Sequence, residues 1–196
     1  MKIKIFGTKI YVSFLFSATL SLMLATDRTG LMIPTLFAVL IHEAGHLFAM
    51  WASDCSPKEI RLIPASVQIV ESISGAPAGI GVVLCGPLAN LAVAAALFIN
   101  FYLSGFDISL RFGMLNGVLA VFNMLPVTGL DGGRLIEHII ARKKDLYTAE
   151  KTVRIITLIV SAAAFILGVW LALSRNVNIS VFIVALYLAV CGMMKR

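Results

Sequence analysis

Long apolar segments are the feature of this sequence that most restricts its fold. A helix needs roughly 20 apolar residues to cross the hydrocarbon core of a bilayer, which is about 30 Å thick. Six segments come close to that length, near residues 10–26, 31–52, 79–103, 108–126, 152–174 and 177–194. A single segment can satisfy its backbone hydrogen bonds inside lipid only as a helix. The sequence therefore predicts an all-α polytopic membrane protein with about six transmembrane helices.

The composition agrees with a membrane protein and excludes the main soluble classes. Apolar residues of the set AVILMFWYC make up 60% of the 196 residues, and only 13% are charged. A soluble domain carries about 25% charged residues, so this chain has too few charges to solvate such a surface. Disorder is excluded because it requires low hydrophobicity. No repeat or long linker divides the chain, and we expect one domain over residues 1–196.

The basic residues predict the orientation of the six helices. Cytoplasmic segments of membrane proteins are enriched in Lys and Arg. If the N-terminus is cytoplasmic, all but three of the 16 basic residues fall inside, the exceptions being Arg28, Arg111 and Arg175. We therefore expect an integral protein of the bacterial cytoplasmic membrane, or its equivalent, with both termini in the cytoplasm. The net charge of +6 then reflects topology, and nucleic acid is not an expected partner.

Two segments between the apolar stretches have a different pattern. Residues 59–71 combine β-branched side chains with partial alternation, which predicts an extended strand or a short hairpin at the cytoplasmic surface. Residues 123–133 contain Pro126 and three glycines, which should end the fourth helix. Irregular backbone at membrane depth is tolerated only where protein or a water-filled cavity shelters it. The second segment therefore indicates a functional site.

The second apolar stretch contains His42-Glu43-Ala44-Gly45-His46. Side chains four residues apart lie on one face of a helix, so both imidazoles can bind one metal ion. Glu43 is near enough to act as general base on a metal-bound water. Buried polar residues that tie helices together are the alternative, but ionisable groups inside a span are costly and usually mark function. We therefore predict a zinc site with both histidines as ligands.

A catalytic zinc site needs a third protein ligand and leaves one position open to water. An extended motif with a third histidine is absent, because Ala49 and Ala52 occupy its last two positions. Glu59 and Glu71 lie in the polar segment after the second span. The remaining intramembrane acid is Asp131, whose alternative role is that of a turn or helix N-cap residue. Because the topology places it in the same cytoplasmic half as the two histidines, we predict Asp131 as the third ligand.

Three motifs follow one another between about residues 31 and 140. They are His42-Glu43-Ala44-Gly45-His46, Gly86-Pro87-Leu88-Ala89-Asn90, and Asn123-x-x-Pro126-x-x-x-Leu130-Asp131-Gly132. Together they resemble the site-2 protease family of zinc intramembrane metalloproteases. The resemblance implies a Zn2+ ion bound by His42, His46 and Asp131. It also implies Glu43 as the catalytic base and Asn123 as a polar group near the substrate or the oxyanion.

The domains that we expect in this chain indicate which branch of the family it resembles. Six spans without an inserted PDZ domain resemble the branch of the sporulation stage IV protein FB. We expect no nucleotide-binding CBS domain, which some relatives carry at the C-terminus, because the sequence ends at Arg196 after the sixth span. Relatives often have Pro-Phe-Gly-Gly where this chain has Pro64-Ala65-Ser66-Val67, and the shape of a substrate-binding hairpin is left open by that difference.

The favoured function is a site-2-type zinc-dependent endopeptidase that cleaves a membrane-associated protein near the cytoplasmic face. The resemblance implies regulated intramembrane proteolysis of a regulator, such as a pro-sigma factor in sporulation. The expected partners are a membrane-tethered substrate, inhibitory or regulatory membrane proteins, and the lipid bilayer. The alternative is a non-enzymatic zinc-binding scaffold or a metal transporter. A transporter would need polar residues along a path through several spans, whereas here they gather on one side.

Overall fold

The computed structural model describes residues 2–5, 8–55, 57–63, 66–71, 79–173 and 186. The chain divides into two compact units, Met1–Phe122 and Asn123–Arg196, and each is described by itself. The sixth predicted span, 177–194, lies outside the described residues apart from position 186. The expectation of one domain over residues 1–196 stays a prediction.

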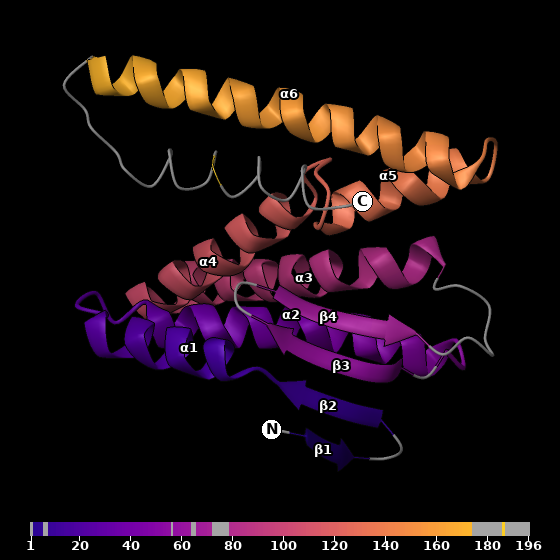
Figure 1. Ribbon diagram of the computed structural model, residues 1–196. Helices are drawn as coiled ribbons and strands as arrows, with labels where there is room; N and C mark the ends of the chain where they lie inside the picture. Colours follow the sequence, from indigo (N-terminus) through magenta and orange to yellow (C-terminus); the bar gives the residue numbers. More distant parts are fainter. Residues whose placement is uncertain are drawn as a thin grey trace. The chain divides into compact units, whose positions relative to one another are not determined.

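Within the described part of the first unit, four strands form a sheet in the order β1-β2-β3-β4 (Figure 1). The strands are β1 (Lys2–Ile5), β2 (Thr8–Val12), β3 (Pro57–Ile63) and β4 (Ser66–Glu71). The outer pairs are antiparallel, whereas β2 and β3 run parallel. A parallel pair needs a long crossover connection, which the two helices between β2 and β3 provide. Strands are thus present where the sequence predicted extended structure, and their position at the cytoplasmic surface stays a prediction.

The two N-terminal strands correct the predicted fold class. The chain is mostly helical, but its sheet is larger than the short hairpin that the sequence predicted. Residues 10–12, assigned to the first transmembrane helix, belong to β2, and α1 spans only Phe14–Thr26. The physical reason is non-local: β2 pairs with β3, so that Ile10 lies opposite Ile60. Strand propensity depends on such pairing more than on the local sequence.

Two long apolar helices form the centre of the first unit. They are α2 (Met32–Ala52) and α3 (Ile80–Ser104), within one or two residues of the predicted spans. Gly45 of α2 allows a close approach, because a Cβ there would lie 2.5 Å from the Cys85 carbonyl oxygen and 2.9 Å from the Ala89 Cβ. The α2–α3 contact is therefore tight at this point, and it brings α3 against the histidine-bearing part of α2.

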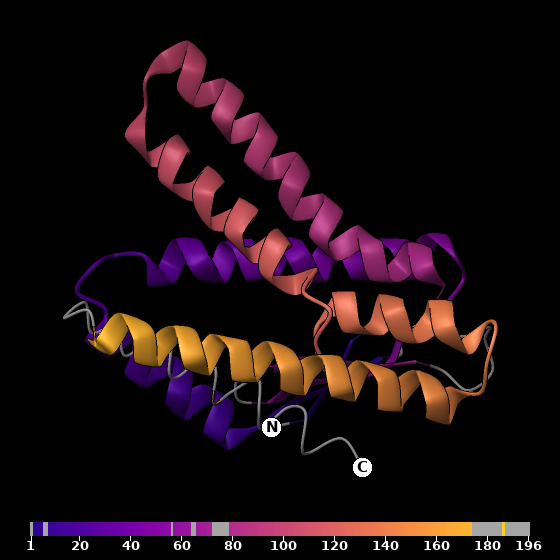
Figure 2. The same cartoon turned by 90° about the horizontal axis from the view of Figure 1, so that it is seen from above.

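The helix α4 (Asp107–Asn123) follows α3 after a short turn, and Figure 2 shows the two running in opposite directions. It ends three residues before the predicted boundary at 126, in agreement with the helix-breaking effect expected of the segment that contains Pro126. The segment 124–130 that follows is a series of turns. The fourth predicted helix is therefore present but shorter at its C-terminal end.

The second unit contains an antiparallel pair of helices, α5 (Asp131–Ala141) and α6 (Leu146–Leu173). Figures 1 and 2 show α5 alongside the first part of α6. The sequence did not predict α5, because Arg134, Glu137 and His138 interrupt its apolar residues within three turns. It also placed the start of α6 six residues too late.

Among the described residues, three helices are long and apolar enough to cross a membrane. They are Met32–Ala52, Ile80–Ser104 and Leu146–Leu171. Large apolar side chains are exposed on them, including Phe48 and Trp51 of α2 and Trp170 of α6. Such an exposed apolar surface is typical of a lipid or partner interface. The six spans and the cytoplasmic location of both termini stay predictions.

Asp145 caps the start of α6. Its carboxylate accepts hydrogen bonds from the Thr148 hydroxyl at 2.6 Å and from the Thr148 N–H at 2.9 Å. These bonds, the hydroxyl first, hold the pKa of the exposed carboxyl below its usual value of 3.8. A carboxyl whose pKa is lowered on folding stabilises the protein above its unfolded pKa, and the contribution is lost as the pH falls through the folded pKa.

Asp145→Ala is therefore expected to lower the melting temperature by a few degrees at pH 7, the usual effect of losing a cap. The difference from wild type should shrink as the pH falls below 3.8. Thermal melting in detergent at several pH values measures both effects. Asp145→Asn keeps one acceptor oxygen but loses the second oxygen and the charge, so its melting temperature at pH 7 should lie between those of Asp145→Ala and wild type. An Asp145→Ala protein as stable as wild type at neutral pH would contradict the cap.

Candidate metal centre

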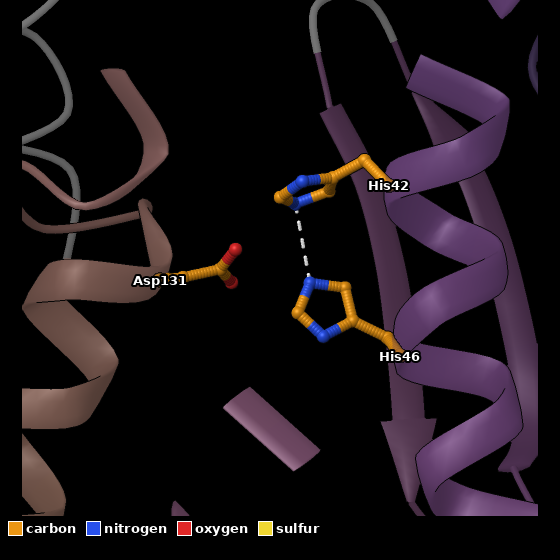
Figure 3. Close-up of side chains that lie close together, drawn as sticks. All are labelled: His42, His46 and Asp131. Carbon is orange, nitrogen blue, oxygen red and sulfur yellow. Dashed lines mark hydrogen bonds between the residues drawn. The ribbon is translucent and has the colours of Figure 1, made fainter. Parts of the chain in front are cut away.

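The helix α2 places His42 and His46 side by side, as their four-residue spacing predicts. The two imidazoles are 5% and 7% exposed, and their Nε2 atoms lie 3.2 Å apart (Figure 3). Two nitrogen ligands at 2.0–2.1 Å from a tetrahedral zinc ion are about 3.4 Å apart. The observed separation therefore suits one metal ion bound by both Nε2 atoms.

The ring of His46 is oriented by the neighbouring helix. Its Nδ1–H donates a hydrogen bond to the Val82 carbonyl of α3, at 2.8 Å. A neutral imidazole that donates at Nδ1 has its lone pair at Nε2, the atom that faces His42. Bonds of this kind from the second ring nitrogen to a carbonyl are common for metal-ligating histidines. The α2–α3 contact thus leaves the Nε2 lone pair of His46 available to a metal ion.

Gly86 of α3 leaves the space that the His46 ring occupies. A Cβ at this position would lie 2.6 Å from the His46 Cε1 and still closer to its Nε2. Only glycine is therefore compatible with the observed ring position. Gly86 belongs to the second of the three sequence motifs, but the motif by itself does not predict the contact with the His46 ring. The sequence pattern at this position is a glycine followed by Pro87 inside an otherwise apolar helix.

Glu43 is partly buried on α2. It precedes His46 by three residues, a spacing at which side chains are neighbours on a helix surface. The helical period therefore places Glu43 and His46 at neighbouring positions on α2. The role of Glu43 as catalytic base stays a prediction.

In the second unit, Asp131 is the first residue of α5 and is 6% exposed. The helix N-cap is Leu130, with extended backbone at φ −101° and ψ 162°, so the N-cap alternative for Asp131 is wrong. A carboxylate in the first turn of a helix is stabilised by the helix dipole. Asn123, partly buried, is the last residue of α4. Figure 3 labels the three predicted ligands, two from α2 and one from α5, and all three are buried.

Comparison with known proteins matches part of the chain to one family model and also finds relatives and a similar fold. Residues 106–167 match the model of peptidase family M50, a range that includes Asn123 and Asp131. A zinc metalloprotease of Methanocaldococcus jannaschii is 25% identical over 146 residues, which cover 71% of this chain and 42% of that protein. A Synechocystis protein with "zinc metalloprotease" in its name is 32% identical over 117 residues, 54% of this chain and 30% of that protein. The chain thus spans less than half the length of both curated relatives.

The fold is similar to that of a solved site-2 protease from Methanocaldococcus jannaschii. The TM-score is 0.71 with 22% sequence identity, and the similarity covers 98% of this chain and 93% of that chain. At this identity the comparison shows the fold alone.

Proposed function

We propose that this chain is a zinc-dependent intramembrane endopeptidase. The family model, the curated relatives and the fold all support peptidase family M50. The observation that carries the proposal is the buried imidazole pair of α2, with Nε2 atoms 3.2 Å apart and Glu43 beside His46 on the same helix. Two histidines and a glutamate in this order on a helix are typical of zinc peptidases.

The donor set fits zinc. Zn2+ accepts imidazole nitrogen and carboxylate oxygen, and it is the metal in the names of both curated relatives. His42, His46 and Asp131 would hold it, with one position open for water or substrate. Because imidazole must be neutral to ligate a metal, the Val82 carbonyl supports binding by fixing the tautomer of His46.

Glu43 and Asn123 have different roles in the proposed hydrolysis. When bound, zinc lowers the pKa of a water molecule toward about 7 and polarises a carbonyl. Glu43 accepts the proton of the attacking water and returns it to the leaving amine, which completes hydrolysis of the peptide bond. The side-chain amide of Asn123 donates a hydrogen bond to the substrate near its carbonyl oxygen. These two roles are proposals that follow from the family resemblance.

The substrate class follows from the membrane setting. Three described helices are apolar enough to span a bilayer, so the chain acts as an integral membrane protein on membrane-associated substrates. A transmembrane helix hides its peptide bonds in internal hydrogen bonds, and it must unwind before cleavage. In the described sheet, β4 is an edge strand, and an edge strand can pair with an extended peptide. A regulator such as a pro-sigma factor is a candidate substrate, cleaved near the cytoplasmic face.

Removal of the metal tests this function. The purified protein is expected to contain about one zinc ion per chain, and chelation should abolish cleavage of a membrane-tethered reporter until zinc is restored. Asp131→Asn should lose most of the bound zinc, since it removes a charged ligand. Asp107→Asn is the matched control, because Asp107 is also an acid in the first turn of a helix but is exposed.

Two outcomes would contradict the proposal. Cleavage that persists after complete removal of the metal would exclude a metallopeptidase. Stoichiometric zinc without cleavage, together with zinc uptake into proteoliposomes, would favour the alternative of a transporter. Equal zinc contents in Asp131→Asn and wild type would exclude Asp131 as a ligand while leaving the histidine pair in place.

A further inference from the structure

The segment between α4 and α5, residues 124–130, is folded tightly onto itself. The Val127 N–H donates to the Leu125 carbonyl at 2.7 Å, and the Leu130 N–H donates to the Val127 carbonyl at 3.1 Å. Val127 is completely buried, and Leu130 is 8% exposed. This segment, which we call the α4–α5 turn, leads directly into Asp131.

The α4–α5 turn also packs against the first turn of α5 without room for side chains. A Cβ at Gly132 would collide with the carbonyl oxygens of Met124 and Leu125. A Cβ at Gly133 would collide with the carbonyl of Val127 and lie 3.2 Å from the Thr128 nitrogen. The two glycines that follow Asp131 therefore hold the backbone of α5 against the turn, so that a shift of the turn moves Asp131.

Thr157 of α6 holds the turn from the other side. Its Oγ1 accepts a hydrogen bond from the Thr128 N–H at 2.8 Å and lies 3.0 Å from the Thr128 Oγ1. The same Oγ1 donates to the Val153 carbonyl of its own helix at 2.8 Å. A hydroxyl can donate one hydrogen bond and accept two, so the Thr128 hydroxyl is the donor in the third bond.

These bonds are shielded from solvent. Thr157 is completely buried and Thr128 is 5% exposed. Val127, next to Thr128 in the sequence, and Val153, four residues before Thr157, are fully buried as well. A buried N–H without an acceptor is costly, and native structures avoid it. Thr157 supplies the acceptor for the Thr128 N–H, and no water can replace it without opening the contact between α6 and the turn.

We propose that Thr157 is a positioning residue for Asp131, acting through the α4–α5 turn to keep the carboxylate in place for metal binding. The proposal rests on the proposed function, in which Asp131 is a zinc ligand. Residues that orient metal ligands through hydrogen bonds change metal affinity by about 10- to 100-fold when they are removed. Thr157 differs from such residues in acting on the backbone that carries the ligand.

Zinc affinity of the full chain in detergent tests the proposal, measured by competition with a chromophoric chelator. Thr157→Val keeps the shape of the side chain and removes its hydroxyl, and it is expected to raise the Kd for zinc by about 10- to 100-fold. Thr157→Ser restores the hydroxyl and should return the Kd to near the wild-type value. If Thr157 acted only by packing, Thr157→Ser would raise the Kd for zinc more than Thr157→Val, because Ser is smaller than Val.

Thr152→Val is the matched control. Thr152 lies on the same helix, and its hydroxyl donates to the Thr148 carbonyl at 2.8 Å, just as that of Thr157 donates to Val153. The two threonines thus make the same bond within α6 and differ in the contact with Thr128. Thr152→Val should leave the Kd for zinc unchanged.

The outcomes separate this inference from the proposed function. A wild-type Kd in folded Thr157→Val would overturn the positioning role, whereas absence of zinc from the wild-type protein would overturn the proposed function. If Thr157→Val does not fold, Thr157→Ala decides. It also removes the acceptor of the Thr128 N–H, so the Kd should rise by about 10- to 100-fold, and an unchanged Kd would overturn the proposal.

Discussion

Glu43→Gln is expected to abolish peptide cleavage while zinc remains bound. The substitution keeps the size of the side chain on α2 but removes the carboxylate that we propose as the acceptor of the proton of the attacking water. General base catalysis contributes about 10²- to 10⁴-fold to a reaction rate, so we expect a decrease of at least about 100-fold. Cleavage of a membrane-tethered reporter in detergent or proteoliposomes measures the rate, and metal analysis measures bound zinc.

The zinc content distinguishes loss of the base from loss of the metal. Glu43 is not among the proposed ligands, so the zinc content of Glu43→Gln should equal that of wild type. Glu150→Gln on α6 is the control for the chemical change, because Glu150 is exposed. The inactive protein should also retain its substrate, which allows the substrate to be identified by co-purification. Undiminished cleavage by a folded Glu43→Gln protein would refute the assignment of the base.

The second large effect is expected from Gly86→Ala. The added methyl group would overlap the His46 ring, so the ring must rotate away from its position beside His42. That rotation also breaks the hydrogen bond between His46 Nδ1 and the Val82 carbonyl. We expect the Kd for zinc to rise by at least the 10- to 100-fold that loss of an orienting partner costs, with a matching loss of cleavage.

The position of the methyl group explains why the fold should survive. The atoms that it meets belong to the end of one side chain, which can move, and not to the backbone of α2. Gly81→Ala is the matched control on the same helix, because a Cβ there has no neighbouring atom within 4 Å. Melting without zinc should be similar for both variants. A wild-type zinc affinity in Gly86→Ala, or an equal loss in Gly81→Ala, would contradict this account of the site.

Several features of the site were predictable because they are local. The spacing of His42 and His46 places both on one face of any α-helix, and the structure brings their Nε2 atoms to 3.2 Å. The ends of α2 and α3 were predictable to within one or two residues, because a long apolar run has few alternatives to a helix. The break after Asn123 followed from the glycines and Pro126.

Other features were not predictable because they depend on residues far apart in the chain. Residues 10–12 read as the start of an apolar helix, and only their pairing with β3 makes them a strand. Gly86 is required by the ring of His46, 40 residues earlier, and no local pattern contains that relation. Thr152 and Thr157 make the same bond within α6, and it is the contact with Thr128 that gives Thr157 a link to the turn.

The sequence by itself determined the residues on which the proposed chemistry depends: apolar helices, an imidazole pair one helical turn apart, a neighbouring glutamate and a later aspartate. These follow from residue type and helical period, which act over a few residues. Only the tertiary structure decided what surrounds the predicted ligands: Val82 and Gly86 lie against the ring of His46, and the α4–α5 turn, bonded to Thr157, packs against the first turn of α5. The reason is that close packing and buried hydrogen bonds form between segments whose approach no local spacing specifies.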